Sequence, residues 1–134
     1  MLLPHGTVIA LADGKKFELF RNSGKEAEPE LTAIDSPRLD ETNKGSGGHH
    51  QTSSANPSSH RLEEDAHAAA VANWLNSQVL GHKIETLVVI ADPRTLGEMR
   101  RHYHKQLEQA LHGELAKDLV GRTGPEIIAA LRGK

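Results

Sequence analysis

The chain has 134 residues, of which 37% are hydrophobic and 3% aromatic, and its formal net charge is −2. This length suffices for one domain with a buried core. The nearly neutral charge excludes a global field that would attract nucleic acid or a membrane surface, so any such binding needs a local patch. Cysteine is absent, which excludes disulfides, thiol catalysis and cysteine-ligated zinc.

The N-terminal residues predict neither an export signal nor a membrane anchor. Their apolar stretch is interrupted at Pro4-His5-Gly6, stops at Asp13, and lacks the basic start and small-residue cleavage site of a secretory signal. Nowhere does the sequence contain the roughly 18 consecutive apolar residues that a membrane span requires. We therefore expect a cytoplasmic protein that does not enter a membrane.

The first third of the chain predicts three strands. Residues 7–12 form a short, nearly continuous apolar run that is typical of a strand covered on both faces. Asp13-Gly14 predicts a two-residue hairpin turn, because both residue types accept positive φ. Residues 16–21 then alternate between apolar and polar and complete the hairpin. Residues 31–34 are a candidate third strand.

Residues 36–59 have a different character. The segment is polar and rich in glycine and serine, and it is nearly devoid of residues that could enter a core. Such a composition predicts a mobile loop. A loop of this length inside a compact domain is uncommon and is usually functional or disordered.

Residues 60–80 predict a long amphipathic helix that ends at Gly81. Residues 86–91 predict a second fully buried strand, and Asp92 followed by Pro93 predicts the cap and first turn of a second helix. The apolar stripe of the first helix consists of Ala68, Val71, Ala72, Leu75 and Val79, and that of the second helix consists of Leu96, Met99 and Tyr103.

The last part of the chain leaves one element open. Residues 107–115 fit either a continued helix or a strand, because leucines recur at helical spacing while Gly113 interrupts them. Thr123 and Glu126 have the spacing of a capping box and predict a final short helix. The order of these elements predicts a mixed sheet with helices packed on it.

Four segments, in this order, resemble the bacterial host attachment family (proteins required for attachment to host cells): VIALADGKKFELF, HRLEEDAHAAAVANWLN, LVVIADPRTLGEMR and GELAKDL. That family is similar in turn to the middle domain of archaeal and eukaryotic class-one peptide-chain release factors. The resemblance implies one α/β domain over residues 1–134, with a ribonuclease H-like five-stranded mixed sheet, an antiparallel second strand and helices on both faces. It also favours a strand over residues 108–115.

In the release factors, a Gly-Gly-Gln loop precedes the first long helix and reaches the peptidyl-transferase centre of the ribosome. The resemblance makes five residues of this chain candidates for RNA binding, namely Gly47, Gly48, His49, His50 and Gln51. Glycines let backbone amides approach crowded RNA closely. The glutamine comes two residues later than in the release factors, so the release activity does not carry over, and a plain flexible loop is the alternative interpretation.

The second helix is the most basic stretch of the chain, and its candidate RNA-binding residues are Arg94, Arg100 and Arg101. Arginines on one helix can bind phosphates without reading the base sequence, in a manner that depends on salt. The alternative interpretation is an ordinary solvated helix face.

Three carboxylates suggest a second class of function. Asp13 follows the first strand, Glu64 lies at the start of the first long helix, and Asp92 follows the fourth strand. Carboxylates at such places in a ribonuclease H-like sheet can hold two metal ions that activate water. Each residue also has a structural explanation. Asp13 can form the hairpin turn, Glu64 can interact with the helix dipole from the first turn, and Asp92 can cap the second helix. No pair of histidines within one helix has the spacing of a zinc site, and we predict no metal and no cofactor.

The sequence thus predicts a non-catalytic RNA- or ribosome-associated binding domain that resembles a release-factor middle domain. The alternatives are a metal-dependent nuclease or hydrolase that uses the three carboxylates, and a protein-interaction module linked to host attachment. Trp74 is expected to be a core anchor.

Overall fold

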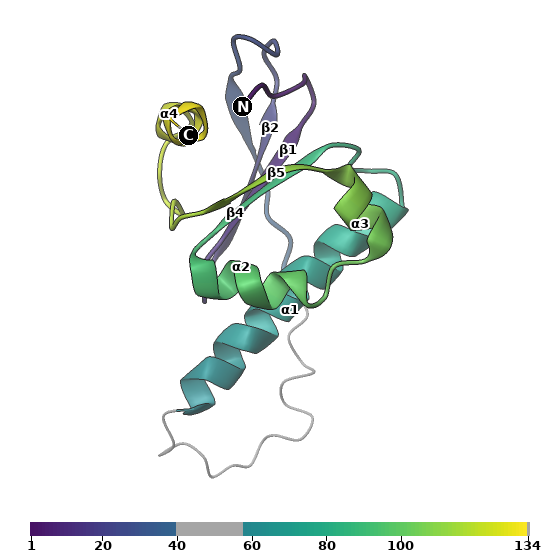
Figure 1. The fold of residues 1–134 in the computed structure, drawn as a ribbon, viewed down its shortest axis with the longest axis vertical. Helices are drawn as coiled ribbons and strands as arrows, with labels where there is room; N and C mark the ends of the chain where they lie inside the picture. Colours follow the sequence, from purple (N-terminus) through teal and green to yellow (C-terminus); the bar gives the residue numbers. More distant parts are fainter. Residues whose placement is uncertain (40–57, 134) are drawn as a thin grey trace.

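The computed structural model describes residues 1–39 and 58–133 of the chain (Figure 1). Most of the loop predicted over residues 36–59 lies outside the described residues. The five candidate residues Gly47, Gly48, His49, His50 and Gln51 therefore also lie outside them.

Five strands form one sheet in the order β3-β2-β1-β4-β5. The central strand β1 (Val8–Ala12) pairs antiparallel with β2 (Phe17–Asn22) and parallel with β4 (Leu87–Ala91). The edges are β3 (Leu31–Ile34), antiparallel to β2, and β5 (Leu111–Ala116), parallel to β4. The mixed five-stranded sheet with its antiparallel second strand confirms the fold that the resemblance implies.

Helices cover both faces of this sheet. Helices α1 (Ser58–Leu80), α2 (Pro93–Arg100) and α3 (Lys105–Ala110) pack on one face, while α4 (Gly124–Arg132) packs alone on the other and stands apart from them in Figure 1. The predicted capping box opens α4, because the Thr123 and Glu126 side chains each bond the backbone N–H of the other residue. None of the helices in the described ranges is long and apolar enough to cross a membrane.

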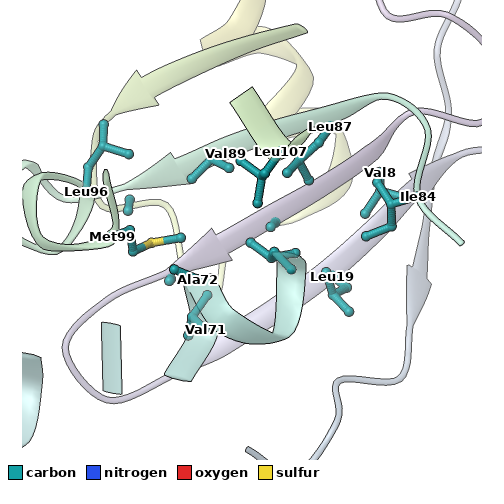
Figure 2. Packing of buried hydrophobic residues seen from close by; sticks show 14 of the residues in the cluster. Val8, Leu19, Val71, Ala72, Ile84, Leu87, Val89, Leu96, Met99 and Leu107 are labelled. Atoms are coloured by element: carbon teal, nitrogen blue, oxygen red, sulfur yellow. The ribbon is translucent and has the colours of Figure 1, made fainter. Parts of the chain in front are cut away.

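The alternation of side chains along β1 and β4 separates two cores. Both strands are buried at every position, so successive residues point to opposite faces and contribute to different clusters. Figure 2 shows the larger cluster, where Val71 and Ala72 of α1 and Met99 of α2 meet the sheet. All five residues of the predicted α1 stripe are buried, which confirms this helix and its orientation.

The turn between β1 and β2 differs from the predicted one. It spans residues 13–16, and neither Asp13 nor Gly14 has a positive φ. The prediction of a two-residue turn with positive φ was therefore wrong. The Asp13 carboxylate instead accepts the backbone N–H groups of Lys15 at 2.8 Å and Lys16 at 2.6 Å. Aspartate stabilises ordinary turns through such bonds, so its presence alone did not require positive φ.

The end of α1 also differs in detail from the prediction. The helix stops at Leu80, directly before Gly81 as expected, but the left-handed residue is His82, with a φ of 62°. The backbone N–H of His82 bonds to the carbonyl of Val79 at 3.0 Å, and that of Lys83 bonds to the carbonyl of Gln78 at 2.8 Å. These two bonds close the helix in the Schellman pattern, in which glycine usually takes the left-handed position.

The segment after α2 corrects two boundaries. Helix α2 ends before Tyr103, and residues 108–110 of the predicted strand belong to α3 instead. Asn76 of α1 organises this connection, because its amide donates to the carbonyl of His102 and accepts from the backbone N–H of His104, at 2.8 and 2.9 Å. The His104 side chain then caps α3. Contacts with α1 therefore hold the connection between α2 and α3, and no local sequence pattern encodes these contacts.

Candidate functional site

The cap of α2 determines where its arginines lie. Asp92 directly follows β4, and its carboxylate accepts the backbone N–H of Thr95 at 3.2 Å, as the sequence predicts for an N-cap. Pro93 occupies the first turn. Because β4 and β1 end side by side, with Ala91 opposite Ala12, α2 begins at the carboxyl edge of the two central strands.

Arg94 lies between α2 and the beginning of α1. Its guanidinium makes two ion pairs, with Glu64 at 3.5 Å and with Asp65 at 2.9 Å. The side chain stays 41% exposed, so these ion pairs are in contact with solvent. Arg94 therefore joins the two helices, and the carboxylates of Glu64 and Asp65 offset its positive charge.

Arg100 is directed to the edge strand β5. Its Nε and Nη2 both donate to one carboxylate oxygen of Glu114, at 3.1 and 2.7 Å, and the Tyr103 hydroxyl donates to the other oxygen at 2.9 Å. The hydrogen bond to Glu114 and the negative charge of the Glu114 carboxylate raise the pKa of Arg100. Burial, together with the charge of Glu114, raises the pKa of Tyr103 well above its ordinary value. This group of three side chains ties the end of α2 to the sheet.

Arg101 is the most open of the three candidate arginines, with 74% of its side chain exposed. Its contact with Glu98 is long, at 3.4 Å, and Glu98 also lies 3.3 Å from the ring of His102. Arg94 and Arg101 are seven residues apart, so they share one helix face about 10 Å apart. Arg100 points away from that face, and the three arginines do not form one uniform patch.

The predicted acidic set gathers at one edge of the sheet. Asp13 and Asp92 follow the neighbouring strands β1 and β4, and a Cβ placed at Gly14 would come within 3.0 Å of the Glu64 side chain. Each carboxylate, however, has a structural role, in the turn, in the α2 cap, or in the ion pair with Arg94. One oxygen of Asp92 is buried without a hydrogen-bond partner. Within residues 1–39 and 58–133, no three acidic or histidine side chains are placed to hold a metal ion.

Sequence reasoning missed the carboxylate partners of the arginines. The pair of Glu98 and Arg101 has helical i,i+3 spacing, so a count of charges along α2 could have found it. Glu114 comes from β5, and Asp65 comes from α1. These two partners become neighbours of α2 only through the fold.

The sheet order, the antiparallel second strand and the helices on both faces define an α/β domain of the ribonuclease H-like class. A family model described as bacterial archaeo-eukaryotic release factor family 12 matches residues 6–131, and the chain belongs to this family. A search of curated proteins finds no match. The family match confirms the release-factor-like part of the resemblance, while the host attachment part stays a prediction.

Proposed function

We propose that this chain is a non-catalytic binding domain that associates with ribosomal RNA. The observation that carries the proposal is the match to a release-factor family over residues 6–131. The helix α2 supplies one set of contacts, and the loop residues Gly47, Gly48, His49, His50 and Gln51, which precede α1 in the sequence, supply a second.

The ion pairs of α2 are compatible with this role. An arginine has five N–H donors, and each of these side chains uses no more than two on its carboxylates. Exposed ion pairs contribute about 0 to 1 kcal/mol, so a phosphate can replace the carboxylate partners of Arg94 and Arg101 at little cost, whereas Arg100 remains bound to Glu114. Arg101 is the most exposed and the most loosely paired, and we expect it to contribute most among the three.

Co-sedimentation of the tagged protein with purified ribosomes, across a salt series, tests this proposal. We expect binding that weakens steeply with salt, and a slope of log affinity against log salt that falls by about one unit in Arg101→Ala. Arg122→Ala is a matched control, because Arg122 is exposed in the connection before α4. The control should bind as the unchanged protein does.

Two outcomes contradict the proposal. Absence of the protein from ribosomal fractions, even at low salt, favours the alternative of a protein-interaction module linked to host attachment. Binding whose salt slope is the same in Arg101→Ala and in the unchanged protein removes the role of α2.

A further inference from the structure

An apolar hollow of about 250 Å³ lies between α1 and the strands β2 and β3, on the face that α1 covers. Its apolar lining consists of Val8, Leu19, Ile34, Trp74 and Ile84. Figure 2 shows Val8 and Ile84 side by side at one end of the core. Trp74 is half-buried and held edge-on against Phe17, with ring centroids 5.7 Å apart. This hollow is an apolar cavity with an aromatic wall.

A second hollow, also of about 250 Å³, adjoins the first one. The two share Arg21 and Lys83, and the second adds the side chains of His5 and His82. The Nδ1 of His5 donates to the carbonyl of Gly24 at 2.8 Å, which leaves Nε2 of the neutral ring as a hydrogen-bond acceptor for a ligand. Together the hollows form a site with an apolar end and a polar end that contains the cations of Arg21 and Lys83. Small-molecule sites in proteins combine these two features.

The cations of this site differ from those of α2 in being unpaired. Arg21 and Lys83 are both exposed, and neither makes an ion pair with any carboxylate in the described part of the chain. Two carboxylates do line the site, Asp35 in the apolar hollow and Glu85 in the polar one. They are therefore left to accept hydrogen bonds from hydroxyl or amino groups of a ligand.

The backbone of His82 is a separate observation at the same place. Its left-handed conformation costs a residue with a Cβ about 1 to 2 kcal/mol, and a glycine stands next to it at position 81 without taking the left-handed place. The two Schellman bonds that end α1 hold His82 in this conformation. The end of α1 therefore fixes where His82 lies in the lining of the polar hollow.

We infer that the two hollows form one nucleotide site. The base enters the apolar hollow beside Trp74, and the phosphate lies between Arg21 and Lys83. Asp35 and Glu85 accept hydrogen bonds from the amino group of the base and from the ribose hydroxyls. The ligand chemistry is that of a nucleoside phosphate, which either a free nucleotide or a nucleotide of single-stranded RNA supplies.

This inference goes beyond the ribosome proposal and does not depend on it. Arg21 pairs with Val8 at the amino end of β1, whereas Arg94 follows β4 at the carboxyl edge of the sheet. The nucleotide site therefore uses none of the α2 arginines.

Trp74 is the single tryptophan of the chain, so its fluorescence reports binding directly. We expect adenosine 5′-monophosphate to change this fluorescence in a saturable manner. Adenosine alone and inorganic phosphate alone should bind at least about tenfold more weakly, because each lacks one half of the contacts. Tighter binding of a short oligoadenylate identifies RNA as the source, and tighter binding of the mononucleotide identifies a free nucleotide.

Arg21→Ala and Lys83→Ala should each weaken the binding of the mononucleotide by about tenfold, since each removes one charge-assisted contact. Both residues are exposed, so the variants should fold, and Arg122→Ala is the matched control that should bind normally. The inference is overturned if neither the mononucleotide nor the oligonucleotide gives a saturable change. Adenosine that binds as tightly as its phosphate, or normal binding by both variants, overturns it as well.

Discussion

The positive charges of α2 and those at the amino end of the sheet have opposite surroundings. Arg94, Arg100 and Arg101 lie in the most basic part of the sequence, yet each has a carboxylate within 3.5 Å. Arg21 and Lys83 lie in unremarkable parts of the sequence, and both lack an ion pair among the described residues. The charge that is available to a ligand therefore depends on neighbours that the fold supplies, and local charge density is a poor guide to it.

The largest effect should come from the carboxylate that holds the end of α2. Glu114→Gln removes the charge that binds Arg100 and accepts the Tyr103 hydroxyl, at a side chain only 20% exposed. We expect the free energy of unfolding to fall by about 1 to 2 kcal/mol, as for other charge-assisted hydrogen bonds. Urea denaturation measures it, with Glu108→Gln on the exposed surface of α3 as the control. Equal stability of the two variants would show that the Glu114 contacts are not structural.

The direct comparison is between two arginines that are each changed to alanine. Arg100→Ala should lower the free energy of unfolding by about 1 kcal/mol, because it leaves Glu114 with one hydrogen-bonded partner fewer. Arg21→Ala should change it by no more than about 0.5 kcal/mol, as is usual for an exposed residue without a special contact. A larger loss in Arg21→Ala than in Arg100→Ala contradicts the structural role of Arg100.

His82→Gly should have a smaller effect of opposite sign. Glycine takes the left-handed position without steric strain, although it loses more backbone entropy on folding. The free energy of unfolding should rise by roughly 0.5 kcal/mol. Gly81→Ala is the control, because Gly81 does not have a positive φ. If His82→Gly lowers the stability, the backbone entropy of glycine or a contact of the His82 side chain outweighs the strain.

The smallest effect should come from divalent cations at the acidic set. Asp13, Glu64 and Asp92 already serve the turn, the ion pair with Arg94 and the helix cap. We expect millimolar magnesium or manganese to leave the melting temperature unchanged, because a cation that binds the folded state would raise it by mass action. A clear rise that is lost in Asp13→Asn favours the metal-dependent alternative.

Much of the fold follows from local patterns in the sequence. The continuous apolar runs of β1 and β4, the stripe of α1 and the capping box of α4 each encode their element within a few residues. The start of α3 was not predictable in this way, because Asn76 of α1 stabilises the connection between α2 and α3 from a distance.

The candidate site was predictable only in part. The position of Arg94 follows from the Asp92 cap, which the sequence shows directly. The ion pairs of Arg94 and Arg100 involve residues 29 and 14 positions away in the chain, so they arise from tertiary contacts. The hollow beside Trp74 likewise exists only once α1 packs on β2 and β3.

The most direct test of this contrast is an NMR measurement of arginine Nε–H groups in one sample, before and after addition of adenosine 5′-monophosphate. In the free protein, the Nε–H of Arg100 should exchange slowly with water because it is bonded to Glu114, and that of Arg21 should exchange rapidly. On addition of the nucleotide, the signal of Arg21 should shift and become protected, while that of Arg100 stays in place. A shift of Arg100 with no change at Arg21 would contradict the account.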